Sequence, residues 1–97
     1  MASLLLAIFT FSQAELNGKI TDEKGDPLPG ASILLVENGQ GTAADGQGFY
    51  QLKNLENGNF TVQVTFIGHD IVRSTAQFSG SPLTLDFVLK AAPLLLG

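Results

Sequence analysis

The chain lacks cysteine, and it has few charged side chains and a single histidine, His69. Without cysteine it can form no disulfide, no thiolate metal site and no thiol nucleophile. Nucleic-acid binding without sequence preference needs clustered Lys and Arg. The net charge is −4 instead, and the basic residues are scattered: Lys19, Lys24, Lys53, Arg73 and Lys90. These absences argue against nucleic acid as a partner.

Catalytic machinery is also missing from the sequence. No nucleophile and general base can be paired, and acid–base work by two carboxylates would need both groups held across a cleft. His69 follows Gly68 at a predicted turn, where it is interpreted as a turn residue. No Gly-rich phosphate loop precedes a helix, because no helix is predicted. We therefore predict no enzyme, no catalytic or cofactor-binding residues and no cofactor.

Two acidic stretches resemble metal loops only superficially. Asp22, Glu23 and Asp26 cluster among Gly and Pro, as turn residues do, and Asp45-Gly46 is a second turn signal. An EF-hand needs oxygen ligands at fixed alternate positions and a closing Glu, which are absent. A zinc site made of several carboxylates would be an uncommon ligand set. No metal site is predicted, and weak calcium binding at Asp22, Glu23 and Asp26 is the one alternative left open.

Six aromatic residues could in principle line a sugar site. Most of them occupy strand positions that face the predicted core, so packing is the preferred interpretation. They are Phe49, Tyr50, Phe60, Phe66, Phe78 and Phe87. In the strand 49–53 the residues predicted to point inward are Tyr50 and Leu52.

The N-terminal residues 1–14 are unlike the rest. A short apolar run, Leu4–Phe11, precedes Ser12-Gln13-Ala14, which has small residues where a signal peptidase reads them. The run is shorter than the roughly 20 apolar residues that span a bilayer. We predict a secretory leader cleaved after Ala14, although no Lys or Arg precedes the run. A buried first element is the alternative.

The stretch from Asn59 to Gly68 is the clearest strand. It alternates apolar residues (Phe60, Val62, Val64 and Phe66) with polar ones, as a strand with one buried and one wet face does. We predict a central strand of an antiparallel sheet, whose apolar side faces Ile20, Ile33 or the alternating residues of 83–89.

The remaining segments complete an all-β pattern with turn signals at regular intervals. Strands are predicted at 16–21, 31–36, 41–44, 49–53, 71–78 and 83–90. Together with the central strand they predict a seven-stranded antiparallel β-sandwich over residues 15–90. The apolar residues 91–97 are expected to begin a linker to a downstream region.

Three ordered motifs resemble the carboxypeptidase regulatory-like domains, over roughly residues 15–90. They are Leu16–Ile33, Thr42–Tyr50 and Val64–His69. The family usually has an aromatic residue where this chain has His69. The resemblance implies a transthyretin-like, Greek-key sandwich of seven strands with no catalytic residues of its own.

The resemblance also implies the functional setting. Such domains form the periplasmic N-terminal extension of TonB-dependent outer-membrane receptors, including SusC-like glycan importers, directly after a signal peptide. The expectation is therefore an exported accessory domain with protein partners on the periplasmic side of the outer membrane of a Gram-negative bacterium. It would serve nutrient uptake, of glycans or siderophores, through a barrel downstream of this sequence. The alternatives are a folding or positioning domain of a secreted metallopeptidase and a glycan-binding or adhesion module.

Overall fold

The computed structural model describes residues 13–93. Residues 1–12 of the predicted leader and residues 94–97 of the apolar tail lie outside the described part. Ala14, the last residue of the predicted leader, is fully buried and begins the first strand, where it pairs with Leu55. A cleavage site after Ala14 would therefore lie within that strand.

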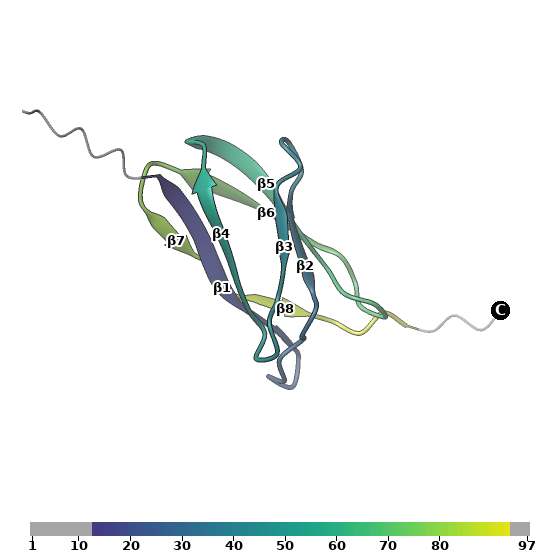
Figure 1. The fold of residues 1–97 in the computed structure, drawn as a ribbon. Helices are drawn as coiled ribbons and strands as arrows, with labels where there is room; N and C mark the ends of the chain where they lie inside the picture. The colour runs from purple at the N-terminus through teal and green to yellow at the C-terminus, as the bar shows by residue number, and fades with distance from the viewer. Residues whose placement is uncertain (1–12, 94–97) are drawn as a thin grey trace, which may run out of the picture.

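Eight strands form two sheets that pack face to face (Figure 1). The strands are β1 (Ala14–Asp22), β2 (Ser32–Leu35), β3 (Gly41–Ala43), β4 (Phe49–Leu55), β5 (Gly58–Thr65), β6 (Val72–Phe78), β7 (Pro82–Thr84) and β8 (Phe87–Leu89). The all-β sandwich is confirmed. The predicted count of seven is wrong, because the segment 83–90 is divided into β7 and β8.

One sheet has the order β3-β2-β5-β6, and all its pairs are antiparallel. The predicted central strand is confirmed, since β5 lies between β2 and β6. In the other sheet β1 pairs with β4 on one side and with β7 and β8 on the other. β7 and β8 run parallel to β1, which corrects the expectation of a wholly antiparallel sandwich. Alternation in a sequence indicates which face is buried, but it does not indicate strand direction.

The core lies between the sheets and is built from alternate residues of the long strands. Leu16 and Ile20 of β1 are fully buried, as are Val62 and Val64 of β5. Tyr50 is buried too, as its strand pattern predicted. Other buried side chains that close the core are Ile33, Leu35, Leu52, Leu55, Phe60, Phe78, Phe87 and Leu89.

Two apolar positions depart from the expected pattern. Phe66 lies beyond the end of β5 and is only partly buried, because the chain turns at Phe66. Val36, the last residue of the predicted strand 31–36, lies just beyond β2 and is 48% exposed. No helix occurs in residues 13–93, so none of the described segments is a helix able to cross a membrane.

Candidate interaction surfaces

The acidic turns already use their carboxylates to hold the backbone. Asp22 Oδ1 accepts hydrogen bonds from the N–H groups of Lys24 (2.8 Å) and Asp26 (3.0 Å). Asp45 Oδ1 accepts from the N–H groups of Gln47 (2.9 Å) and Phe49 (3.0 Å) in the same manner. Both are Asx-type turns, which short polar side chains favour. Within residues 13–93 no group of three or more His, Cys, Asp or Glu side chains is arranged to hold a metal ion.

His69 lies in the turn between β5 and β6, where the sequence placed it. Its Nδ1 is 3.0 Å from the carbonyl oxygen of Ile67, and its ring meets Phe66 edge-on at a centroid distance of 5.2 Å. The Ile67 side chain is 88% exposed. Here the histidine orders a turn, and the turn carries exposed apolar side chains.

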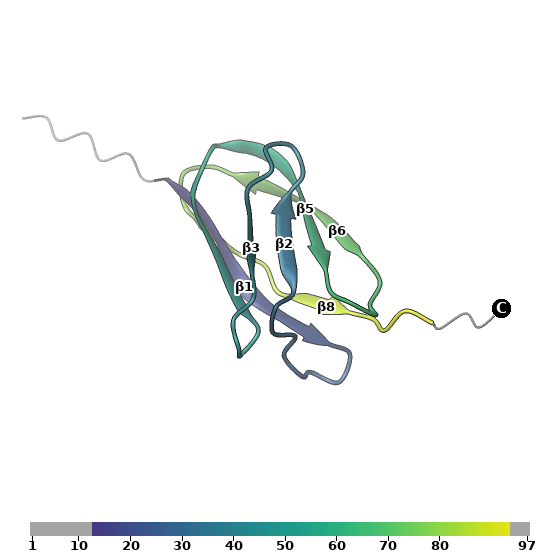
Figure 2. The ribbon, with the colours of Figure 1, turned by 45° about the vertical axis from the view of Figure 1, so that its right-hand side comes forward.

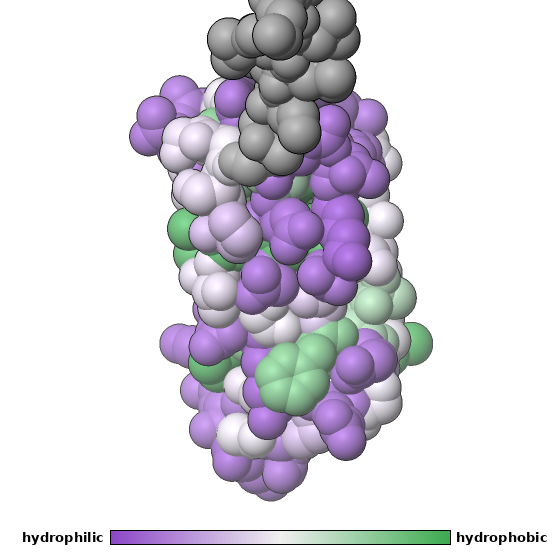
Figure 3. All heavy atoms as spheres, turned by 60° about the vertical axis from the view of Figure 1, so that its left-hand side comes forward, coloured by the Kyte–Doolittle hydropathy of each residue, from purple (hydrophilic) through white to green (hydrophobic). Residues whose placement is uncertain are grey.

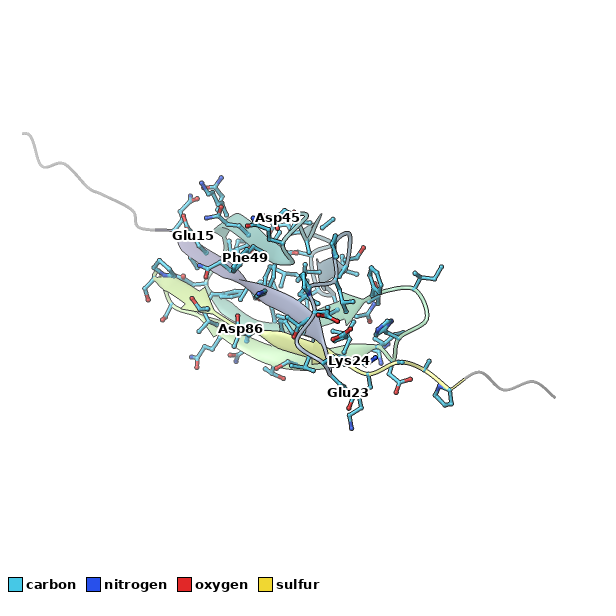
Figure 4. All side chains as sticks on the ribbon, turned by 90° about the horizontal axis from the view of Figure 1, so that it is seen from below. Glu15, Glu23, Lys24, Asp45, Phe49 and Asp86 are labelled. Atoms are coloured by element: carbon cyan, nitrogen blue, oxygen red, sulfur yellow. The ribbon has the colours of Figure 1, made fainter. Side chains whose placement is uncertain are left out.

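A groove of about 710 Å³ runs beside Phe49, which is 49% exposed. Side chains of β1, β3, β4 and β7 line it, together with Asp45 and Asp86. The Lys19 ammonium lies 5.4 Å from the centre of the Phe49 ring, within cation–π range. Figure 4 shows Asp45 and Phe49 close together, with Asp86 farther along the same side.

Phe49 is the aromatic residue of β4 whose side chain points outward. Phe49 and Tyr50 are consecutive in β4, so only one of them can point inward. Tyr50 takes the core position, and Phe49 points out. The inward position predicted for Tyr50 from the sequence is thereby confirmed. The face of the molecule seen in Figure 3 is mainly hydrophilic, and its apolar side chains are isolated rather than gathered into one patch.

The junction between β7 and β8 is held by side chains. The Tyr50 hydroxyl donates to the carbonyl oxygen of Leu85 at 2.6 Å, and the N–H of Lys19 donates to Asp86 Oδ1 at 2.8 Å. Burial raises the pKa of the Tyr50 phenol, and the nearby Asp86 carboxylate raises it further. The phenol therefore stays protonated and keeps its donor at neutral pH. These two side-chain bonds join a backbone bond from the N–H of Leu85 to the carbonyl oxygen of Asn17 (2.8 Å) in holding the junction.

The outer edge of β6 is different. Thr61 of β5 directs its carbonyl oxygen to the N–H of Val36 (3.0 Å) and its N–H to the Glu37 carboxylate (2.6 Å), both on the β2 side. Neighbouring residues in a strand direct their backbone groups to opposite sides, so Phe60 and Val62 bond toward β6.

The register then fixes which groups of β6 point outward. Phe60 is opposite Ala76, and Val62 is opposite Ser74, so Ala76 and Ser74 are bonded to β5. The N–H and C=O groups of the intervening Arg73, Thr75 and Gln77 therefore point to the free edge. Figure 2 shows β6 as the outermost strand of its sheet. No described residue contributes a backbone or side-chain bond to these six groups.

The other edges are interrupted. β3, β7 and β8 have three residues each, and β7 begins at Pro82, which has no N–H. β4 has a register shift against β1 and contains Asn54 with a φ of 59°. Short strands, proline and bulges are the usual means of protecting a sheet edge. β6 spans seven residues in unbroken register, without proline, and carries one charged side chain, Arg73.

Residues 16–97 match the family described as the CarboxypepD_reg-like domain. Because the match covers most of the chain, the protein belongs to this family, as its motifs had indicated. A comparison with curated proteins found no match.

Solved structures resemble the fold at low sequence identity. One is a chain of a type II cohesin–X-dockerin complex from Acetivibrio cellulolyticus, with a TM-score of 0.72, 14% identity and coverage of 80% of this chain and 58% of that chain. A minor pilin of Streptococcus agalactiae has a TM-score of 0.67 and 18% identity, and the match covers 88% of this chain and 47% of the pilin chain. A 3-chlorocatechol 1,2-dioxygenase of Rhodococcus opacus has a TM-score of 0.65 and 7% identity, and the match covers 86% of this chain and 62% of the dioxygenase chain.

These likenesses concern the fold alone. In each case this chain spans less than two thirds of the chain it matches. The matched proteins include a pilin and an enzyme, so the sandwich by itself does not select a function.

Proposed function

We propose that this domain is a non-catalytic accessory module at the N-terminus of a TonB-dependent outer-membrane transporter. It acts through protein contacts on the periplasmic side, and it contributes to nutrient uptake without binding a cofactor. The observation that carries the proposal is membership of the CarboxypepD_reg-like family, directly after a leader-like segment. The two acidic turns support a non-catalytic role, because their carboxylates are engaged by backbone donors.

The gene sequence beyond the codon for Gly97 tests the transporter setting. A short Val-rich acidic segment followed by a plug domain is the expected result. A stop codon, or a peptidase domain with its own zinc ligands, overturns the proposal. The export step is tested separately by the intact mass of protein produced in a Gram-negative host, where the mature chain should begin at about Glu15.

The absence of metal binding is tested by thermal unfolding with and without millimolar calcium or zinc. An ion at about 100 times its dissociation constant adds roughly 2.7 kcal/mol to the stability. In a domain of this size that raises the melting temperature by about ten degrees or more. No shift is expected. A rise of this size would direct attention back to Asp22, Glu23 and Asp26.

One observation favours a second function, glycan binding. Phe49 presents a half-exposed ring in a groove that also carries the side-chain amides of Asn17 and Gln51. Flat apolar rings with nearby amides suit sugar rings, which have one apolar face and hydroxyl groups around it. Titration with neutral oligosaccharides, followed by NMR, would show shifts around Phe49 that are lost in Phe49→Ala. An unchanged spectrum rules this function out.

A further inference from the structure

We propose that the free edge of β6 pairs with the same edge of a second copy of this chain. The two strands run antiparallel about a two-fold axis at Thr75, which joins the two β3-β2-β5-β6 sheets into one continuous sheet. This inference does not depend on the transporter setting.

The pattern of free hydrogen-bonding groups on β6 favours a second copy as the partner. Arg73, Thr75 and Gln77 each direct one N–H and one C=O outward, at every second position of the strand. An antiparallel partner bonds to alternate residues and exchanges two bonds with each. A partner strand must therefore present the same alternation, and a second β6 edge does so by identity.

The register of the two β6 strands also favours this pairing. With Thr75 opposite Thr75 of the second copy, Arg73 lies opposite Gln77 of the second copy and Gln77 opposite its Arg73. All three pairs are then bonded pairs, and all the outward groups of the two edges are used. A slip of one strand by one residue would place outward groups opposite groups that already bond to β5. A two-fold axis at Ser74 or Ala76 would form only two bonded pairs among the three outward residues, instead of three. A two-residue shift of the two-fold axis to Arg73 would bring the two guanidinium groups together, which is unfavourable.

The two faces of β6 are compatible with the same register. Arg73, Thr75 and Gln77 are exposed on the outer face, whereas Ala76 and Phe78 point to the core side. The register centred on Thr75 keeps outer side chains opposite outer side chains. The only charged side chain of the strand then meets an amide of the second copy. A seven-residue edge is small compared with a standard interface, so the dimer should be weak, with a dissociation constant on the order of 0.1 mM.

The decisive experiment is self-crosslinking of single-cysteine variants of the full chain, which contains no other cysteine. A disulfide needs Cα atoms roughly 4.4–6.8 Å apart, and a bonded antiparallel pair places them at about 5.5 Å. Thr75→Cys should therefore form a covalent dimer under mild oxidation. Gln77→Cys is the matched control, because in this register its two substituted side chains would lie about four residues apart along the strand, beyond reach.

Mixing Arg73→Cys with Gln77→Cys adds a positive control. The mixture should give a crosslinked heterodimer, whereas each variant alone should not. Equal crosslinking of Thr75→Cys and Gln77→Cys, or none by Thr75→Cys, overturns the proposal. Sedimentation velocity at protein concentrations from about 10 µM to about 1 mM, which bracket the expected dissociation constant, should show dimer that increases with concentration. A chain that stays monomeric throughout overturns it as well.

Charge variants test the register without altering the backbone. Gln77→Glu places a carboxylate opposite Arg73 at both symmetry-related positions, and Gln77→Arg places a guanidinium there. Two exposed ion pairs at about 0.5 kcal/mol each should strengthen the dimer about fivefold in the first variant, and the like charges should weaken it similarly in the second. Equal effects of both variants would contradict the register. If the chain stays monomeric but binds an unrelated extended peptide, the proposal is overturned. The partner of the β6 edge would then be a strand of a different protein.

Discussion

The two sheets end in edges of opposite character. The β6 edge is one unbroken antiparallel strand of seven residues, and its outward backbone groups have no partner among the described residues. The edge beside β1 is divided into β7 and β8, runs parallel and is held by the side chains of Tyr50 and Asp86. One edge is therefore short and interrupted, and the other is an unbroken strand available to a further strand.

The largest expected effect tests how each edge is anchored in the core. Phe78 of β6 is 2% exposed and packs on Phe60 with ring centroids 5.6 Å apart, whereas Val88 of β8 is 57% exposed. Phe78→Ala should lower the free energy of unfolding by about 3–5 kcal/mol. Val88→Ala should change it by less than about 0.5 kcal/mol. Urea unfolding of both variants measures the difference, and similar losses would contradict the assigned faces.

The second prediction tests which backbone groups of β6 face outward. Proline has no N–H, so it is tolerated where the N–H points to solvent and costs a ladder bond elsewhere. Ser74→Pro removes a bond to β5, whereas Thr75→Pro removes an outward donor. Ser74→Pro should therefore be less stable than Thr75→Pro by about 2–3 kcal/mol.

Thermal or urea unfolding of these two variants should be measured at low micromolar concentration, where self-association makes no contribution. The wild-type chain is the reference. If Thr75→Pro were the more damaging change, the outward set of residues would be wrong and the proposed pairing register would fail with it.

The third prediction concerns the opposite edge. Gly18 of β1 lies against the chain where β7 gives way to β8, and a Cβ at this position would collide with the carbonyl group of Leu85. Gly18→Ala should cost about 1–3 kcal/mol, because the Leu85 carbonyl would have to move away from the Tyr50 hydroxyl. Gly46→Ala is the matched control, since nothing lies within 4 Å of its added Cβ. Equal stability of the two variants would show that the junction can relax freely.

The amino-acid pattern could indicate one edge but not the other. In β5 and β6 apolar and polar residues alternate, and that alternation identified both strands and their buried faces. In the segment 83–90 the alternation is equally regular, and the side chains do alternate in burial. The backbone nevertheless departs from a single ladder at Leu85 and Asp86. That break depends on Gly18 and Tyr50, which are distant in sequence, so no local pattern reveals it.

The candidate surfaces show the same limit. The acidic turns could be interpreted from their Gly and Pro residues, and the structure agrees with their role as turns. The outward position of Phe49 required a choice between two adjacent rings. The free edge of β6 depends on strand order. No described strand lies beyond β6, so the outward backbone groups of Arg73, Thr75 and Gln77 are available for pairing. Strand order follows from tertiary pairing and is not written in the residues of β6 alone.

The smallest expected effect concerns the β2 side of β5, where the exposed Glu37 carboxylate accepts a hydrogen bond from the N–H of Thr61 at 2.6 Å. This hydrogen bond lowers the pKa of the Glu37 carboxyl in the folded state. A group with a lowered folded-state pKa stabilises the fold above its unfolded pKa, and the contribution is lost as the pH falls through the folded pKa. Wild type should therefore exceed Glu37→Gln in stability at about pH 7, and the difference should shrink below about pH 4. Melting temperatures of both proteins across this pH range provide the measurement. A difference that grows on acidification would mean that the Glu37 carboxylate does not hold the N–H of Thr61. The bond from the N–H of Val36 to the Thr61 carbonyl oxygen would then be the only evidence that Arg73, Thr75 and Gln77 point outward.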